Sequence, residues 1–581
     1  MGLALAGRAA GLLWISVLLV SSATSSALDF SNKVHDGLDR AGRKSILQSG
    51  TPSDLTSSSG RSMKGREYKI DLSNLERILG VKLNQENSGG EILRKSRADT
   101  AGSAGILGTL SEQGLVYVKE VLVNEILAEV TPLDIPDIIT RVNSPIGRVD
   151  TMITQIVLSG ATVHYSDIEL GQTGITIYAA GIKASLVMDW RYQYTATYVP
   201  FPVQDGGRAE VEVTGMQAGA TFSMSETNGT LTLHVEECGT YIENLEITLH
   251  GGASWLYQWR VFVYAFDAQI RTSVETQITK QMTTGAEQLD NWLLHLPRRV
   301  PIDDTSAIDV TVVHDPLLSP TFLSVGAKGE FVSLVSPKPY PEPDTELPAG
   351  LFCDQSVKML TIALSDYVLN SAGFVYYDSG FLQWDVDELP GKKYLNTASW
   401  KYIIPQLYKK YPNEDMVLNF AVSAPPKVVL SRDGISSVTS ADMTIKVKDA
   451  TTLEQTPVAC ISLAISMDAI ADLDEGNITA QATLNDLTVS LKWSDVGNFP
   501  VYLVQATVRT IVKDVVVPLL NLNLRRGFPL PVVAGVTLQN SDLRYEDGYI
   551  MVCTDIHYKG GFFHLKKLGE QSGTSKLVLD Q

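Results

Sequence analysis

Hydrophobic and polar positions along the chain follow one arrangement twice. In each copy a short amphipathic helix leads through alternating strands into a long helix with an apolar stripe, and an extended segment follows. In the first copy, apolar residues recur every three or four positions within 115–126, which is typical of a helix. Residues 209–213, 230–235 and 245–250 alternate apolar and polar side chains. This alternation predicts antiparallel strands with one buried and one exposed face.

The long helix of the first copy is predicted from an apolar stripe that runs from Val263 to Leu293. Pro297 ends it, because proline cannot continue a helix, and residues 308–313 predict an extended segment. A stripe of this kind is typical of ordinary core packing, so one such helix indicates no ligand. The stripe recurs in the second copy. The two helices together therefore carry more apolar surface than the core of a simple β-sandwich needs.

The second copy begins with a predicted strand at 357–362 and a short helix at 366–376. Alternation returns, most clearly at 487–492. Apolar residues then recur at helical spacing from Val504 to Leu522. The β-branched residues there favour a strand by propensity, but alternation fails and the 3.6-residue period holds. We therefore predict a second long helix, kinked at Pro518.

The first residues predict a secretory signal peptide over 1–27. Arg8 precedes a short apolar run, and Ser25 and Ala27 fit a small-residue cleavage site. The run is too short to cross about 30 Å of hydrocarbon, which makes an uncleaved anchor the weaker alternative. We therefore expect a secreted, extracellular protein.

The rest of the chain divides by composition. Residues 28–105 contain serine-rich and glycine-rich stretches that predict a mostly disordered or pro-like extension, with a short helix at 70–79. A basic docking arm is the alternative role of this extension. Two domains are expected at 106–335 and 351–572, separated by a proline-rich linker at 336–350.

The charge of the chain argues against some classes of binding partner. The formal net charge is −18, and residues 101–335 hold 12 Lys and Arg against 27 Asp and Glu. Nucleic-acid binding needs a concentrated basic face, so the first domain argues against it. The same charge weakens electrostatic docking of this domain on anionic membranes.

Motifs of catalysis and metal binding are missing from the sequence. It has no Gly-x-Ser-x-Gly elbow and no His-Glu-x-x-His, and its four cysteines are scattered without metal-ligand spacing. Paired acids such as Asp303 and Asp304 lie in loop-like contexts. We predict no enzyme, no metal and no cofactor; a hydrolase and a pure protein-interaction module are the competing classes.

Asn228 and Asn477 lie in sequons and are candidate glycosylation sites in a secreted chain, although such tripeptides also occur by chance.

Several segments, in order along the chain, resemble one family. Residues 498–501 (Asn-Phe-Pro-Val) and 527–531 (Gly-Phe-Pro-Leu-Pro) resemble the closing region of the family of bactericidal/permeability-increasing protein and lipopolysaccharide-binding protein, and 364–373 resembles the start of its second domain. Residues 188–192 and 251–257 are similar to plant members. The resemblance covers about residues 106–565.

This resemblance implies an α+β fold of two tandem twisted antiparallel-sheet barrels, each with a long helix, joined by a central sheet into a boomerang. It also implies one phospholipid-sized apolar pocket in each barrel. Enclosing acyl chains needs shape and apolarity more than any special polar residue. The lining residues predicted for the first pocket are Leu115, Val118, Leu122, Phe266, Ile270, Val274 and Ile278, and those for the second are Tyr367, Val368, Val375, Val504, Val508, Ile511 and Val515. For each of them, plain core packing is the competing interpretation.

The chain departs from the animal members in two respects. Cys238 matches a cysteine that they pair with the long helix, but the helix around Met282 offers no partner, so that disulfide is expected to be absent. Animal endotoxin binders carry a basic tip on the first domain, whereas here only Arg148, Arg191 and Arg208 are scattered over an acidic domain.

The sequence therefore predicts a secreted protein that holds phospholipid or the lipid A part of lipopolysaccharide in two apolar pockets, with a role in antibacterial defence. Its expected partners are phospholipid, lipopolysaccharide and a bacterial or vesicle membrane surface. The alternative is a phospholipid-transfer protein without endotoxin recognition.

Overall fold

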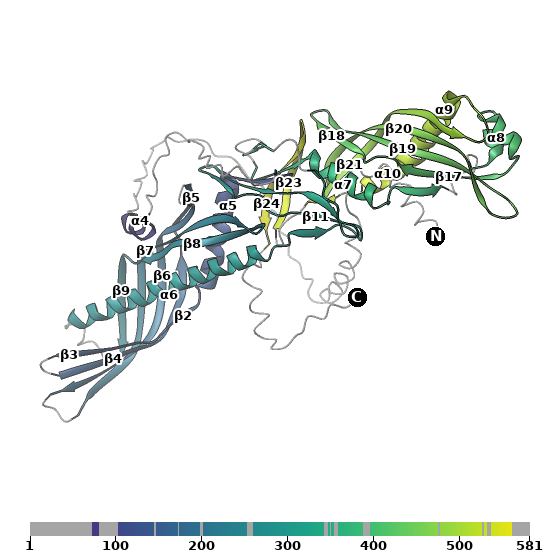
Figure 1. Ribbon diagram of the computed structural model, residues 1–581. Helices are drawn as coiled ribbons and strands as arrows, with labels where there is room; N and C mark the ends of the chain where they lie inside the picture. Colours follow the sequence, from purple (N-terminus) through teal and green to yellow (C-terminus); the bar gives the residue numbers. More distant parts are fainter. Residues whose placement is uncertain are drawn as a thin grey trace, which may run out of the picture.

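The computed structural model describes thirteen stretches of the chain. They are residues 72–80, 103–144, 147–171, 174–197, 201–251, 260–341, 347–348, 350–353, 358–386, 395–474, 477–525, 528–530 and 536–559. The predicted signal peptide, most of the predicted extension and part of the proline-rich linker lie outside these residues. Figure 1 shows an elongated, bent molecule with one helix-and-sheet unit toward each end.

The first unit is a long antiparallel sheet with helices against it. Its elements are α5 (Glu112–Glu129), β2 (Leu133–Ile135), β3 (Ile138–Ser144), β4 (Gly147–Thr162), β5 (Tyr165–Gly171), β6 (Gly174–Ala196), β7 (Val203–Thr227), β8 (Thr230–Tyr241), β9 (Asn244–Gly251) and α6 (Arg260–Leu294). The strands run in the order β2-β4-β6-β7-β8, with β3 on β4, β5 on β6 and β9 on β7. The alternating segments predicted as strands lie in β7, β8 and β9, and the long helix ends three residues before Pro297.

The second unit repeats this plan. Its elements are α7 (Asp366–Asp378), β16 (Gln383–Val386), η3 (Thr397–Trp400), α8 (Pro405–Lys410), β17 (Asp415–Val422), β18 (Lys427–Ser431), β19 (Gly434–Lys448), β20 (Gln455–Asp474), β21 (Asn477–Ser494), α9 (Val501–Ile511), η4 (Val512–Val516), α10 (Val517–Leu524) and β22 (Phe528–Pro529). The sheet order is β16-β17-β19-β20-β21-β22, with β18 on β19.

The second long helix departs from a simple kink at Pro518. Instead of one helix, α9 and α10 are joined by the single π-helical turn η4. Proline has no N–H to donate to the carbonyl four residues earlier, and its ring clashes with that carbonyl. Widening the turn just before the proline relieves the clash.

The predicted barrels are curved sheets that helices complete. Among the described strands, the first sheet ends at β2 and at β8, and these two edges do not pair with each other. Helix α6 contacts β8 and β9 as well as β2 and β3. Among the described residues, the first unit thus combines a twisted antiparallel sheet with a long helix that contacts both ends of it, in agreement with the predicted α+β fold.

A central sheet joins the two units. Its order is β12 (Leu317–Ser319), β13 (Phe322–Ala327), β1 (Ile106–Ser111), β15 (Leu360–Ser365), β24 (Tyr549–Tyr558) and β23 (Val536–Glu546). The first strands of the two copies, β1 and β15, pair antiparallel at its middle, and each is flanked by the last hairpin of its own copy. The order thus has an approximate twofold symmetry between β1 and β15.

A small sheet and a disulfide reinforce this junction. Strands β10 (Arg299–Pro301), β11 (Ser306–Asp309) and β14 (Glu330–Ser333) form the small sheet, and β14 packs on α7 of the second copy. The Ser371 hydroxyl accepts the Phe331 N–H at 3.0 Å. Cys353 and Cys553 form a disulfide beside the central sheet that the scattered cysteines did not predict.

A short helix of the predicted extension packs on the outside of the first unit. Helix α4 (Ser73–Leu79) buries Leu75 and Leu79 against Tyr178 of β6. Ile177 and Ala179, the neighbours of Tyr178, pack against inner clusters, so the side chain of Tyr178 lies on the opposite, outer face. Residues 73–79 are thus a docked helix, within the short helix that the sequence predicts.

Two glycines make room for α4. Tyr178, Gly219 and Gly239 lie in one cross-strand row over β6, β7 and β8. A Cβ atom on Gly239 would lie 2.1 Å from Cγ2 of Ile78, and one on Gly219 would lie 2.9 Å from Cδ1 of Leu79. The paired glycines form a recess that α4 fills, and Figure 1 shows α4 next to β7.

Replacing Gly239 by valine is expected to displace α4 and leave the sheet folded. Valine suits a strand, but its side chain would occupy the space of Ile78. A helix of this length is not stable alone in water. Hydrogen–deuterium exchange should show lost protection at 73–79 and unchanged protection in β7. The matched control is Gly160→Val, where a Cβ meets nothing within 4 Å; equal loss in both variants would contradict the recess.

Removing the disulfide is expected to destabilise the junction. It closes a loop with a sequence separation of 200 residues, and losing a native disulfide typically costs about 2–5 kcal/mol. Cys353→Ser together with Cys553→Ser should lower the denaturation midpoint. Cys460→Ala, at a buried free cysteine of β20, is the control for a change of core volume.

Candidate lipid-binding interior

The interior of the first unit is built by one face of α6 and the inner face of its sheet. Ile270, Val274 and Ile278 are 1%, 0% and 5% exposed, and Phe266 is half-buried beside them. The four-residue spacing places all four on one side of the helix. They pack against apolar side chains of β4, β6 and β7 that include Ile153, Ile156, Leu186, Met188, Val211 and Val213.

Polar side chains of α6 bind the neighbouring edge of the sheet. The Glu275 carboxylate accepts the Ile242 N–H at 2.8 Å, and Asp290 accepts the Leu233 N–H at 2.7 Å. Arg271 donates to the carbonyl of Ile242. Burial raises the pKa of Glu275, while the Ile242 N–H and Arg271 oppose that rise. Helix α6 therefore supplies hydrogen-bond partners to backbone N–H and C=O groups at the edge of the sheet. Without the helix, these groups would need another strand or water.

Helix α5 contributes an apolar surface that is only partly covered. Of its residues, the buried ones are Gly114, Leu115 and Lys119, whereas Val118 and Leu122 are half-buried. Leu115 does not join the α6 cluster; it packs with Leu170, Ile175 and Leu323 in a separate one. The set predicted to line the first pocket is thus divided between two clusters, with Val118 and Leu122 outside both.

The position of α5 is fixed by polar contacts that sequence reasoning missed. Buried Lys119 donates from Nζ to the carbonyl of Ser166 on the edge strand β5, at 3.1 Å. The Ser111 hydroxyl caps the helix by accepting the Gly114 N–H at 3.3 Å. The Tyr117 hydroxyl accepts the Tyr558 N–H of β24 at 2.8 Å. A lysine among the apolar residues of a predicted helix indicates a buried polar contact. The sequence pattern does not predict which carbonyl group that lysine binds.

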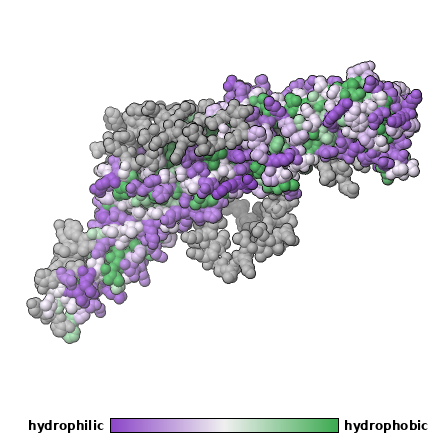
Figure 2. Space-filling view, viewed as in Figure 1, coloured by the Kyte–Doolittle hydropathy of each residue, from purple (hydrophilic) through white to green (hydrophobic). Residues whose placement is uncertain are grey.

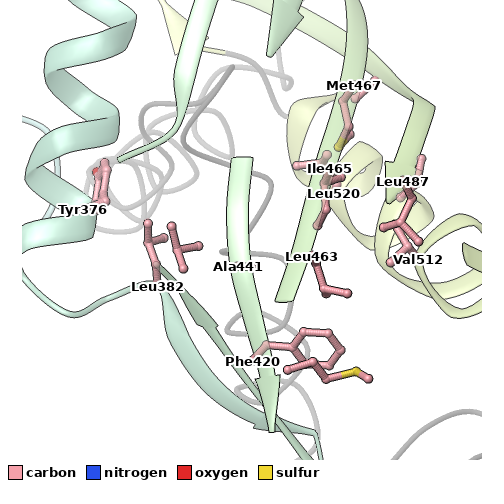
Figure 3. Packing of buried hydrophobic residues seen from close by; sticks show 14 of the residues in the cluster. Tyr376, Leu382, Phe420, Ala441, Leu463, Ile465, Met467, Leu487, Val512 and Leu520 are labelled. Atoms are coloured by element: carbon pink, nitrogen blue, oxygen red, sulfur yellow. The ribbon is translucent and has the colours of Figure 1, made fainter. Parts of the chain in front are cut away.

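The interior of the second unit gathers its predicted residues more completely. Val368 and Val375 of α7 lie in one buried cluster with Val504, Val508 and Ile511 of α9. Figure 3 shows Val512 and Leu520, farther along the same helical segment, near Leu487, Ile465 and Met467 of the sheet. These residues form one continuous apolar interior between α7, α9 and the sheet.

Two residues predicted to line the second pocket are not found in this buried cluster. Tyr367 is buried, but it lies outside that cluster, with its ring 5.6 Å from the ring of Tyr340 in the predicted linker. The side chain of Val515, within η4, lies outside the described residues. Lipid contact remains a prediction for every residue of both sets, because burial alone does not distinguish a lining residue from a packed one.

Among the described residues at the tip of the first unit, arginines form charge pairs with an acidic residue. Arg141 and Arg148 approach Asp150 at 2.6 and 3.0 Å, and the hydrogen bond from Arg141 is the largest cause that lowers the pKa of Asp150. Apolar side chains are exposed nearby, including Ile139 and Phe201. Figure 2 shows hydrophobic atoms on the arm that carries β3 and β4. Arg191 and Arg208 lie exposed on β6 and β7.

Cys238 lies on β8 facing α6, with its Sγ 3.9 Å from the carbonyl oxygen of Thr279. It is a free cysteine in the structure, and burial raises the pKa of its thiol. Of the sequon residues, Asn228 is exposed in the β7–β8 turn, whereas Asn477 is half-buried at the start of β21, opposite Pro529. Their glycosylation stays a prediction.

Metal-binding clusters and membrane-spanning helices are both absent from the described residues. These residues contain no group of three or more His, Cys, Asp or Glu that could hold a metal ion. Within the same stretches, no helix is both long and apolar enough to cross a membrane. The dominant property of both interiors is continuous apolar surface between helix and sheet.

Comparison with known proteins places the chain in a family. The model of the LBP / BPI / CETP family N-terminal domain matches residues 114–289, and that of the C-terminal domain matches residues 301–558. An Arabidopsis thaliana protein described as a member of the BPI/LBP family is 38% identical over 450 residues, covering 77% of this chain and 91% of that protein.

Animal proteins and a solved structure agree with this assignment. The bactericidal permeability-increasing protein of Sebastes schlegelii is 27% identical, covering 78% of this chain and 96% of its own length. Human lipopolysaccharide-binding protein is 24% identical, covering 78% and 94%. A crystal structure of lipopolysaccharide binding protein matches the fold with a TM-score of 0.52 at 20% identity, covering 79% of this chain and all of that one. The chain belongs to the LBP / BPI / CETP family.

Proposed function

We propose that this protein is a secreted lipid-binding protein that holds phospholipid or the lipid A part of lipopolysaccharide between helix and sheet in each unit. The observation that carries the proposal is the apolar surface of α5, where Val118 and Leu122 stay half-buried beside an otherwise buried interior. The equivalent helix α7 buries Val368 and Val375. Half-buried apolar side chains beside a buried apolar interior suit an apolar occupant, and acyl chains match them in polarity.

The energetics favour such a cargo. Each CH₂ removed from water contributes about 0.8 kcal/mol, so one long acyl chain contributes on the order of 10 kcal/mol before entropy costs. No special polar residue is required for this term. Relatives named for lipopolysaccharide binding and for bactericidal permeability increase support a lipid ligand and a role in antibacterial defence. Binding rather than catalysis follows the same family relationship.

Secretion is supported by two independent features. The first residues match a signal peptide, and the Cys353–Cys553 disulfide suits an oxidising compartment. The exposed position of Asn228 suits a glycan in the same compartment.

Charge favours phospholipid over lipopolysaccharide as the main ligand. Residues 101–335 hold 27 acidic against 12 basic residues, and Arg141 and Arg148 are paired with Asp150 at the tip. The phosphates of lipid A need free basic side chains. A phospholipid-transfer protein without endotoxin recognition is therefore the second candidate.

Solvent extraction of the purified protein, followed by mass spectrometry, is expected to release two glycerophospholipids per chain. Val118→Trp with Leu122→Trp should fill the space beside α5 and reduce this to one, because the second unit is unchanged. The matched control is Val116→Trp, on the opposite side of α5 and already 37% exposed. An empty extract from the wild-type protein would refute lipid binding.

A competition assay is expected to distinguish the two ligands. Transfer of labelled phospholipid between vesicles should be accelerated by the protein and be insensitive to added lipopolysaccharide. If lipopolysaccharide inhibits transfer stoichiometrically, endotoxin is a true ligand and the charge argument is wrong. Asp150→Asn, which leaves Arg141 and Arg148 without their carboxylate, should increase any such inhibition.

A further inference from the structure

The far end of the second unit carries a basic and aromatic segment in an otherwise acidic protein. Residues 395–413 contain three lysines and no acidic residue, within a chain whose formal net charge is −18. Three tyrosines lie next to these lysines in the sequence. The structure folds this segment into η3 and α8, which Figure 1 places at the end of the molecule remote from α6.

Apolar side chains anchor this segment and point its polar side chains outward. Trp400, Ile404 and Leu407 are 0%, 0% and 1% exposed in the core of the second unit. Tyr402 is 83% exposed, and the lysines are exposed as well. The segment is therefore a fixed part of the fold that presents an amphipathic surface. We call Lys401, Tyr402, Tyr408, Lys409, Lys410 and Tyr411 the lysine–tyrosine tip.

The start of α9 extends this surface. Gln406 donates to the carbonyl of Asn498 at 3.1 Å, and Lys410 donates to the carbonyl of Asp495 at 3.3 Å. These bonds hold α8 against the loop that precedes α9. Tyr502, in the first turn of α9, is 72% exposed. Exposed tyrosines thus lie on two adjoining elements at the same end of the molecule.

Lys401 and Lys409 stay available to an external anion, whereas Lys410 already donates to the carbonyl of Asp495. Lys401 lies 5.3 Å from the ring centroid of Tyr408 and 5.9 Å from that of Tyr402, and Lys410 lies 5.4 Å from that of Tyr411. None of the ion pairs found in the described stretches includes a lysine of this tip. The nearest acids in sequence, Glu414 and Asp415, follow the segment, and Asp415 accepts the Asn396 amide. At the opposite end, arginines are paired with Asp150.

We infer that the lysine–tyrosine tip is a docking site for an anionic phospholipid surface. Tyrosine has an apolar ring and a polar hydroxyl, which suits the headgroup level of a bilayer. Lysine near such a surface is attracted by its negative potential. The tip complements this surface in charge and polarity, while most of the chain is repelled from it. Docking by this end goes beyond the proposed cargo site, since it concerns the outside of the second unit rather than the interior of either.

Vesicle sedimentation of the full chain tests the inference. Binding is expected to vesicles of phosphatidylcholine with phosphatidylglycerol, and to weaken strongly with phosphatidylcholine alone or with added salt. Lys401→Gln with Lys409→Gln should lower the partition coefficient about 30-fold, because each lysine near such a surface contributes about 1 kcal/mol. Tyr402→Ser should lower it several-fold with little change in salt dependence.

The matched control is Lys183→Gln with Lys280→Gln, which removes the same charge from exposed positions of the first unit. Equal loss in control and tip variants, or wild-type binding by the tip variants, would overturn the inference. Equal binding to both vesicle types, or binding to soluble dextran sulfate in place of vesicles, would also overturn it. Lipid extraction from the same preparations separates this outcome from failure of the proposed function, since the tip variants should keep their cargo.

Discussion

The antiparallel pairing of β1 with β15 is the contact on which the rest of the molecule depends. It pairs Ile106 with Leu364 and Leu110 with Leu360, and it makes one sheet out of strands from both copies. Each strand leads directly into a helix whose N-cap is a serine, Ser111 or Ser365. The pairing therefore sets where α5 and α7 begin and how each meets its own sheet.

Further contacts make this junction specific. The Tyr376 hydroxyl of α7 bonds Asp303 and Ser306 next to β11, and Tyr117 of α5 bonds the backbone of β24. Burial and the neighbouring Asp303 carboxylate raise the pKa of the Tyr376 hydroxyl. Such polar contacts across copies fix register and orientation in a way that apolar packing alone does not.

The sequence predicts the elements better than their partners. Helical spacing identified the stripe of Ile270, Val274 and Ile278, and alternation identified β7 to β9, because each pattern depends on local geometry. Alternation does not say which strand lies beside which, so the central sheet and the Cys353–Cys553 bridge could not be read from it. The π-helical turn before Pro518 and the Gly219–Gly239 recess depend on contacts between segments far apart in the chain. For the candidate site, the sequence predicted which helix faces are apolar. It did not predict that Leu115 packs in a separate cluster from the α6 residues expected to line the same pocket.

Closing the first sheet with α6 has a consequence for how a large molecule enters. A barrel closed by strands opens only by breaking a cooperative ladder of backbone hydrogen bonds. Here one side of the seam is a helix held by apolar packing and by side-chain bonds such as that of Asp290 to β8 and that of Glu275 to Ile242, just after β8. Sliding or tilting a helix keeps its own backbone bonds intact. On the proposed function, this seam is where an elongated, water-insoluble molecule would pass sideways between the interior and the outside with the fewest broken backbone hydrogen bonds.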